Sequence, residues 1–281
     1  SGIAGIWNDM NEPATGDISC QDMLFAGFED DSSHGRGHNE YALLMAKATH
    51  EGLLEANDDE RPFILSRAGS PGIQRYAANW MGDNASRWEH LEMGLPMAMG
   101  LGLSGQAFVG GDIGGFVEPT EAELFIRWIQ CAAYTPFCRN HNDDDRDQYV
   151  WSFDKKVEAI SRHYIEERYK LLPYIYTQFV LSSQSGVPIQ RPLVFDYQGD
   201  AETHSLDSQF LLGSDILVAP IVKAGQSSRS LYLPKGEWYS VIEEKVISGP
   251  GWHICPCPLE KIPVYYRCGA LIPVFSEIAA S

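Results

Sequence analysis

Gly5-Ile6-Trp7-Asn8-Asp9-Met10-Asn11-Glu12-Pro13 is the stretch from which the fold is predicted. Its short apolar run stops in acid and amide side chains, and Pro13 can neither donate to a strand ladder nor continue one. We therefore predict a buried strand that ends near Pro13 and carries a polar cluster at its carboxyl end. In barrels and open sheets of parallel strands, catalytic groups lie at that edge.

The order of strand, polar tip and helix recurs five times along the chain. Further strands are predicted at 62–67, 76–81, 106–109 and 134–137, with a loop at 14–37 and helices at 38–56, after 86, after 120 and at 154–183. This alternation predicts parallel strands with crossover helices, in part of an eight-stranded barrel or in a doubly wound sheet. Beyond about residue 190, short strands between Gly and Pro turns predict a small all-β domain.

Local signals predict where individual helices begin and end. Ser86 with Glu89, and Thr120 with Glu123, have the spacing of capping boxes. Pro173 predicts a kink or break in the helix at 154–183, because proline lacks the N–H that the helix needs there.

Composition limits the possible partners. The 281 residues are 44% hydrophobic and carry a net charge of -17, which is typical of a folded globular protein that repels phosphate backbones and anionic lipid surfaces. We therefore expect neither nucleic acid nor a membrane as a partner. The uncharged stretch 94–111 contains six glycines and a proline, so we interpret it as a buried helix-to-strand passage and not as a membrane span.

The cysteines indicate a reducing compartment. Six are spread over the chain without a Cys-x-x-Cys pair: Cys20, Cys131, Cys138, Cys255, Cys257 and Cys268. This is too sparse for a disulfide scaffold, so we expect mostly buried thiols and a cytoplasmic protein, with Cys255-Pro256-Cys257 as the pattern that could differ. No signal peptide is visible at residues 1–3, and any such segment would lie upstream.

The predicted strand tips supply the parts of a sugar-cleaving site. They carry carboxylates and arginines, with tryptophan and phenylalanine between them: Asp9, Asn11, Glu12, Arg67, Asp83, Asp112, Arg139, His141, Trp7, Trp80 and Phe116. Carboxylates that converge in one pocket can be held in different protonation states, one as an acid and one as a nucleophile. Aromatic rings stack on sugar faces while charged groups bind the hydroxyls, and two-carboxylate glycoside hydrolysis uses these groups.

The chain resembles glycoside hydrolase family 31, the α-glucosidase and α-xylosidase family. Residues 5–13 are similar to its nucleophile signature, Trp-x-Asp-Met-Asn-Glu-Pro. The resemblance continues in order through residues 64–67, 72–76, 80–83, 111–116 and 139–142, and through 209–220 and 233–239, which look like its proximal C-terminal β-domain. The ordered set covers nearly the whole chain and is highly specific.

The resemblance implies a retaining α-glycosidase with a partial (β/α)8 barrel, about strands 4 to 8, in residues 1–191 and a β-sandwich in residues 192–281. Asp9 would be the nucleophile, and Asp83 the general acid and then base. The sugar-binding residues would be Arg67, Asp112, His141, Trp7, Met10, Trp80 and Phe116, with Glu12 and Arg139 in support. The mechanism needs no metal or cofactor. An α-glucosidase that removes terminal glucose from an oligosaccharide or α-glucoside is the first hypothesis.

Family members carry the first three barrel strands before the nucleophile strand, and this chain begins at what resembles strand four. Half a barrel leaves an open sheet edge and an uncovered apolar interior. We therefore expect a complementing N-terminal polypeptide. A catalytically silent carbohydrate-binding or structural fragment is the alternative, as is the same fold with α-xylosidase, α-galactosidase or transglucosylase specificity.

Several features also allow simpler interpretations. Asp9, Asp112 and His141 could be structural groups paired within the barrel. The sequon at Asn84 is expected to be unused, because a glycan there would block the site. The acidic segment 142–147 lacks the pattern of a calcium loop. The pair His34 and His38 lacks the general-base Glu of a zinc helix, and glycines at 35 and 37 argue against a helix.

Overall fold

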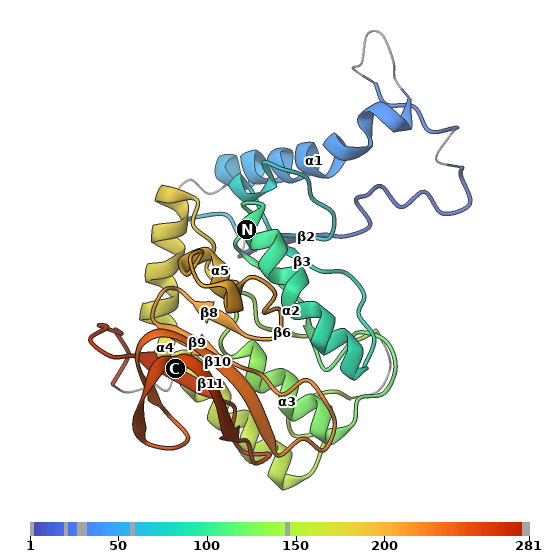
Figure 1. The fold of residues 1–281 in the computed structure, drawn as a ribbon. Coiled ribbons are helices and arrows are strands. Elements are labelled where there is room, and N and C mark those ends of the chain that lie inside the picture. The colour runs from blue at the N-terminus through green and yellow to red at the C-terminus, as the bar shows by residue number, and fades with distance from the viewer. Residues whose placement is uncertain (1–2, 20–21, 27–32, 57–59, 144–146, 277–281) are drawn as a thin grey trace.

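A computed structural model describes residues 3–19, 22–26, 33–56, 60–143 and 147–276. The chain runs from a parallel β/α region into a β-domain whose strands are antiparallel, and α1 lies at one end of the molecule (Figure 1). The helices are α1 (His34–Ala56), α2 (Trp88–Leu103), α3 (Ala122–Ala132), α4 (Lys155–Ser185), α5 (Leu193–Asp196) and the 3-10 turns Ile73–Arg75 and Ala201–Thr203. The strands are β1 (Ile6–Asn8), β2 (Ile64–Ser66), β3 (Ala78–Trp80), β4 (Val109–Gly110), β5 (Asp112–Ile113), β6 (Arg139–Asn140), β7 (Gln190–Arg191), β8 (Phe210–Leu212), β9 (Ile216–Val218), β10 (Ser228–Ser240), β11 (Lys245–Pro256) and β12 (Val264–Arg267).

The first region contains the predicted parallel strands in sequence order. β1, β2, β3 and β4 form one parallel sheet, and β5, which follows β4 after Gly111, pairs in parallel with β6. α1, α2 and α3 connect successive strands, and α4 follows β6. The prediction of parallel strands with crossover helices is therefore confirmed for this region. Among the described residues, β1 and β6 each have a strand neighbour on one side only.

Two predicted elements differ from the structure. No α-helix follows β2; the short connection contains a 3-10 turn, because Asn79 Nδ2 donates to Ser66 O and Ala68 O and holds the loop against the strand ends. The strand predicted at 134–137 is wrong, since β6 begins at Arg139. The guanidinium of Arg168 donates hydrogen bonds to four backbone carbonyls of residues 132–136. These carbonyls therefore have partners without pairing to a neighbouring strand.

Neither predicted capping box forms. The N-cap residues of α2 and α3 are Arg87 and Glu121, without side-chain caps. The hydroxyls of Ser86 and Thr120 instead contact each other and both donate to Gly114 O. They therefore fasten the start of each helix to the same loop between β5 and α3.

Two further helix expectations differ from the structure. α4 runs through Pro173 as one continuous helix, so the break does not occur and a kink stays a prediction. The helix is closed by Asp154, whose side chain accepts from Val157 N at 2.9 Å, and by Gly186 in the left-handed region. α1 already begins at His34 and includes both glycines. Gly37 is needed in this helix because a Cβ there would lie 2.6 Å from the Phe25 ring.

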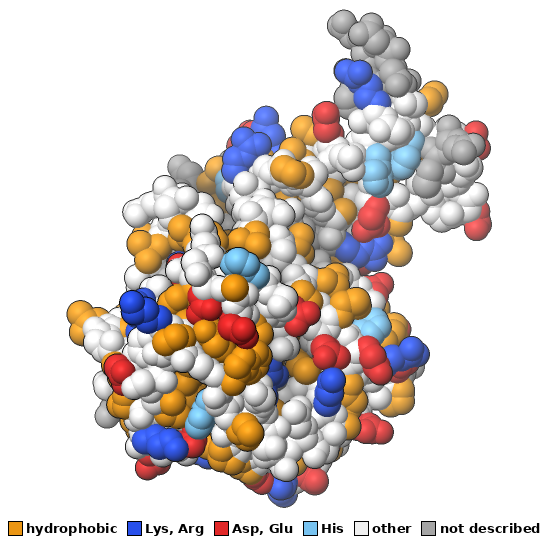
Figure 2. Space-filling view, in the orientation of Figure 1, with side chains coloured by type: hydrophobic (Ala, Val, Ile, Leu, Met, Phe, Trp, Pro, Cys, Tyr) orange, Lys and Arg blue, Asp and Glu red, His pale blue; other side chains and the backbone are white. Residues whose placement is uncertain are grey.

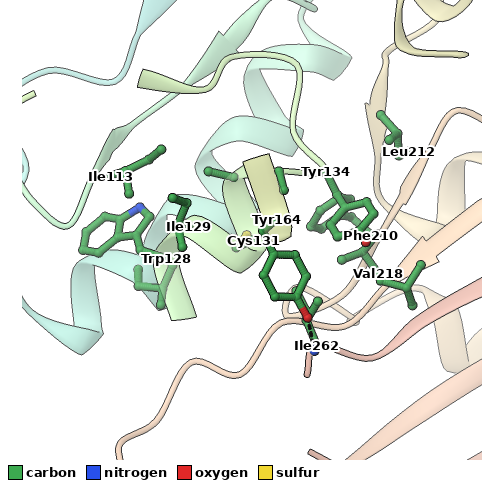
Figure 3. Close-up of a cluster of buried hydrophobic side chains, with 14 of the residues drawn as sticks. Ile113, Trp128, Ile129, Cys131, Tyr134, Tyr164, Phe210, Leu212, Val218 and Ile262 are labelled. Carbon is green, nitrogen blue, oxygen red and sulfur yellow. Dashed lines mark hydrogen bonds between the residues drawn. The ribbon is translucent and has the colours of Figure 1, made fainter. Parts of the chain in front are cut away.

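The β-domain packs directly on the last two helices of the parallel region. Its sheet has the strand order β11-β10-β12-β9-β8-β7. Trp128 of α3, Tyr164 of α4 and Phe210 of β8 share one buried core (Figure 3). Tyr164 adds a polar link, because its hydroxyl accepts from Ile262 N at 3.2 Å and donates to Glu260 O at 3.1 Å. The buried Arg127 of α3 donates to further carbonyls of the β-domain.

The described cysteines agree with the expected pattern in part. Cys131, Cys255 and Cys257 are buried thiols, Cys138 is half-buried and Cys268 is exposed, whereas Cys20 lies outside the described residues. None of the described helices combines the length and the apolar character needed to span a membrane. Hydrophobic side chains do remain exposed among charged ones on the surface (Figure 2).

Candidate active site

The strand registers bring the predicted tips to one edge of the parallel region. Asn8 is aligned with Ser66, and Ser66 with Asn79, so that Asp9, Arg67 and Trp80 follow at the same edge. In β5 and β6, Asp112 is aligned with Arg139. Parallel strands end together, and the structure therefore gathers side chains that lie up to 130 residues apart in the sequence.

Arg67 lies at the centre of the carboxylates. It forms two hydrogen bonds with Glu12, 2.7 Å from Nε to Oε1 and 2.9 Å from Nη2 to Oε2. Its Nη1 lies 3.2 Å from Asp9 Oδ1 and 3.9 Å from Asp83 Oδ2. Because one nitrogen reaches both oxygens, Asp9 and Asp83 are at most about 7 Å apart at these atoms. The hydrogen bonds from Arg67 lower the pKa of Glu12, which keeps Glu12 anionic and gives it a supporting position.

Aromatic rings form one wall beside the carboxylates. Trp7 meets Trp80 edge-on at 5.6 Å between ring centroids, and it meets His141 edge-on at 5.3 Å. Phe116 stacks on His141, with 5.1 Å between the ring centroids. Arg139 lies over Trp80 and Trp7, with its Cζ 5.1 and 5.5 Å from the ring centroids. Burial, followed by the charge of Arg139, lowers the pKa of His141 and favours the neutral imidazole.

Asp112 is a fully buried carboxylate that pairs with Arg139. Arg139 Nε donates to Oδ1 at 2.8 Å, and Nη2 lies 2.6 Å from the same oxygen without the alignment of a hydrogen bond. Oδ2 has no hydrogen-bond partner among the described residues. Burial raises the pKa of Asp112 to about 6, although the charge of Arg139 acts in the opposite direction. Contact between Asp112 and a sugar stays a prediction, because this side chain has no exposed surface.

Asp112 should make folding stability depend on pH. Because the folded protein holds this proton more tightly than the unfolded chain does, its contribution is fully present below about pH 4 and is lost as pH rises through about 6, by ~3 kcal/mol. We expect the difference in unfolding free energy between wild type and Asp112→Asn to fall by this amount over that range, as measured by urea unfolding. A difference that stays constant with pH would contradict the assignment.

An open cavity adjoins this cluster. It has a volume of about 620 Å³, and Glu12, Arg67, Trp80 and Asp83 are among its lining residues, whereas Asp9 and Asp112 are not. Asp9 remains reachable, with 37% of its side chain exposed. Trp7 and Met10 are also exposed, and Met10 has a left-handed backbone, with its N–H donating to Asp9 Oδ1 at 2.8 Å.

Three amide side chains hold the tips together: Asn11 is predicted among the strand tips but without this role, and Asn8 and Asn84 are not predicted as site residues. Asn11 Nδ2 donates to Ser66 Oγ at 2.8 Å, and Asn11 Oδ1 accepts from Ala68 N at 3.0 Å. Asn8 donates to Thr49 of α1 at 3.2 Å. Asn84 contacts the loop that carries Phe116. These amides lie next to the predicted acids in the sequence, but only the fold shows which strand each one reaches.

No metal centre is formed by the described residues, since they contain no group of three His, Cys, Asp or Glu side chains placed to hold an ion. The rings of His34 and His38 do approach each other, with centroids 4.7 Å apart on α1. Of the acidic segment 142–147, residues 144–146 lie outside the described part of the chain.

Comparison with known families decides what this arrangement belongs to. The model of the glycosyl hydrolases family 31 TIM-barrel domain matches residues 1–178, and that of the family 31 C-terminal domain matches residues 186–272. The chain belongs to glycosyl hydrolase family 31. The fold is thus a fragment of the family's TIM barrel followed by its all-β C-terminal domain.

Individual family 31 proteins resemble the chain over nearly all of its length. Alpha-glucosidase 2 of Bacillus thermoamyloliquefaciens is 44% identical, over 96% of this chain and 35% of its own length. Neutral alpha-glucosidase AB of Homo sapiens is 38% identical, over 98% and 30%. The chain therefore spans about a third of these curated relatives.

Solved structures show the same architecture. A family 31 dextranase from Flavobacterium johnsoniae, complexed with glucose, superposes with a TM-score of 0.91 at 34% identity, covering 99% of this chain and 36% of that one. A family 31 alpha-xylosidase from a soil metagenome, complexed with xylose, gives 0.88 at 31% identity, covering 96% and 43%.

Proposed function

We propose that this chain supplies the catalytic groups of a retaining, exo-acting α-glycosidase that removes terminal non-reducing α-linked glucose. The observation that carries the proposal is the position of Arg67 between Asp9 and Asp83, at the edge where the parallel strands end. Two carboxylates on either side of one sugar carbon are the groups that hydrolysis by double displacement requires. Similarity to proteins named alpha-glucosidase supports glucose as the sugar.

In the first step, Asp9 attacks the anomeric carbon while the glycosidic bond breaks. Asp83 gives its proton to the departing oxygen, so that a neutral alcohol leaves. In the second step, Asp83 takes a proton from water, and the water oxygen displaces Asp9 from the anomeric carbon. Each displacement inverts the configuration, and two inversions restore it. Arg67 would stabilise the negative charge of Asp9 before it attacks and as it departs in the second step, and Trp7, Trp80, Phe116 and His141 would pack on the sugar ring.

The complete barrel is part of the same proposal. We assign β1, β2, β3, the joined β4 and β5, and β6 to barrel strands 4 to 8. The one-sided pairing of β1 and β6 among the described residues supports this assignment, because a closed barrel requires both edges to be paired. An N-terminal polypeptide of the same protein would provide the missing strands and part of the sugar pocket. The domain boundary after residue 191 stays a prediction, and β7 already pairs with β8.

The configuration of the first product tests the proposal. Proton NMR of the hydrolysis of an aryl α-glucoside by the full-length protein, where all the glucose released comes from the glucosyl group that is attacked, should show α-glucose before the anomers equilibrate. Early β-glucose, or the absence of turnover, would contradict it. A panel of α-glucosides, α-xylosides and α-galactosides, with and without glucosyl acceptors, distinguishes the other specificities. The same assay on the isolated chain tests the alternative of a catalytically silent fragment, which predicts no turnover by this chain alone.

A further inference from the structure

Asn84 follows Asp83 directly and lies in a segment that is tied to the neighbouring strand tip. Phe116 N and Val117 N donate to Asn84 O at 2.8 and 3.0 Å, and Ser86 N donates to Val117 O at 2.9 Å. A parallel bridge joins Ala85 and Val117. The two segments approach closely enough that a Cβ on residue 115 would lie 2.4 Å from Ser86 N, which makes Gly115 necessary.

The side chain of Asn84 adds a second connection and uses both ends of its amide. Nδ2 donates to Asp112 O at 3.0 Å, and Oδ1 accepts from Phe116 N at 3.0 Å. A Cβ on residue 111 would lie 3.3 Å from Nδ2, so Gly111 leaves room for this contact. One amide thus connects the backbone of Asp112, the backbone of Phe116 and the residue next to Asp83.

Asp83 itself is held only weakly through its side chain. Its carboxylate is half exposed, and its ion pair with Arg67 is long, at 3.9 Å. Gly82 before it has a positive φ of 78°, a conformation that glycine adopts at little cost, and a Cβ there would meet nothing within 4 Å. The backbone on either side of this turn is fixed, by the hydrogen bond of 2.9 Å from Met81 N to Gly110 O before it and by Asn84 after it.

We propose that Asn84 is a positioning residue that holds Asp83 at a set distance from the strand tip that carries Asp112 and Phe116. This proposal rests on the assignment of Asp83 as the acid and base. Proton transfer to the leaving oxygen needs hydrogen-bond geometry, and a displacement of about 1 Å can cost roughly 10²-fold in rate. Since both amide atoms are engaged, Asn84 is also unsuited to carry a glycan.

Two substitutions in the full-length protein test the proposal. Asn84→Ala removes both hydrogen bonds of the amide. Asn84→Asp keeps the acceptor for Phe116 N but places a charged oxygen against Asp112 O. Gln209→Ala is the matched control: Gln209 is a buried amide whose two ends bond the N–H and the C=O of Tyr232 within the β-domain.

Hydrogen exchange is the readout that does not depend on activity. The amide of Phe116 should exchange faster in Asn84→Ala than in wild type, because it loses the side-chain oxygen and keeps only the carbonyl of residue 84 as acceptor. It should keep its wild-type rate in Gln209→Ala, and the amide of Val117, which bonds only that carbonyl, is an internal reference. Unchanged exchange at Phe116 in Asn84→Ala would overturn the proposal even if the protein proved not to be a glycosidase.

Kinetics then tests the catalytic consequence. For a poor leaving group such as the glucose of maltose, kcat should fall about 10²-fold in Asn84→Ala with KM changed less than about 3-fold. An activated aryl glucoside, which needs little proton donation, should lose much less. Asn84→Asp should in addition move the basic limb of the pH–rate profile upward, because a negative charge beside Asp83 favours the protonated acid. Equal losses for both leaving groups would refute the positioning role.

Discussion

Replacing Asp9 by alanine should reduce kcat/KM by about four orders of magnitude or more, for activated and natural substrates alike. Without the carboxylate no glycosyl ester can form, and neither Glu12 nor Asp83 can replace it. Glu12 is occupied by two hydrogen bonds from Arg67, and Asp83 is required as the acid that protonates the leaving oxygen. The loss should appear in kcat, because Asp9 acts on the reacting carbon.

Azide provides a positive test of the same variant. In Asp9→Ala the small anion can enter the space left by the carboxylate and attack an activated α-glucoside from the same side, which yields β-glucosyl azide by a single inversion. Asp17→Ala, which removes an exposed acid outside the cluster, should retain wild-type activity. Full activity in Asp9→Ala would refute its role as the nucleophile.

Replacing Asp83 by alanine should separate substrates by their leaving groups. Hydrolysis of maltose should fall about 10²- to 10⁴-fold, which is the usual contribution of general acid catalysis. An aryl glucoside with an acidic phenol should form the glycosyl enzyme at a nearly unchanged rate, because the departing phenolate needs no proton. Its turnover should then be limited by the second step, where water loses its base.

Burst kinetics and azide rescue distinguish this result from general damage to the site. In Asp83→Ala, release of the phenol should show a rapid first turnover followed by slow hydrolysis. Azide, which needs no base, should accelerate the slow phase and give α-glucosyl azide. A loss of the same size for both leaving groups, without a burst, would show that Asp83 is not the acid.

Much of the fold could be predicted because the information is local and repeated. Alternating strands, polar tips and helices imply parallel strands whose ends meet, and the registers of β1, β2 and β3 confirm that the tips do meet. The helix at 154–183 was equally clear, since its apolar stripe is long and Asp154 caps it. A long periodic pattern and polar residues at strand ends predict the same elements whichever distant residues pack against them.

The predictions are wrong where a residue distant in sequence makes the contact that the local sequence pattern assigns to a neighbour. Ser86 and Thr120 have the spacing of caps, but Gly114 O accepts both hydroxyls once the fold brings it near. The run before β6 is apolar enough for a strand, but Arg168, some thirty residues later, satisfies its carbonyls. Gly37 looks like a helix breaker until Phe25 is found against it. Such contacts cannot be predicted from spacing.

In the candidate site, too, the residues could be predicted from local sequence patterns, but their contacts could not. The acids and aromatic residues were predicted individually, whereas the central position of Arg67 and the complete burial of Asp112 come from the packing of several strands. The role of the amides that orient the tips was missed, for Asn11 as a predicted tip residue and for Asn84 altogether, because an amide beside an acid has no distinctive pattern until its partner is known.

Covalent trapping tests the central claim most directly. The full-length protein is incubated with 5-fluoro-α-glucosyl fluoride, whose ring fluorine slows hydrolysis of the glycosyl enzyme by destabilising the positive charge at the transition state. Peptide mass mapping should then show one fluoroglucosyl group, attached to Asp9. Attachment to Glu12 or another carboxylate, or turnover of the reagent without any labelled peptide together with early β-glucose from an aryl α-glucoside, would contradict the assignment of Asp9 as the nucleophile.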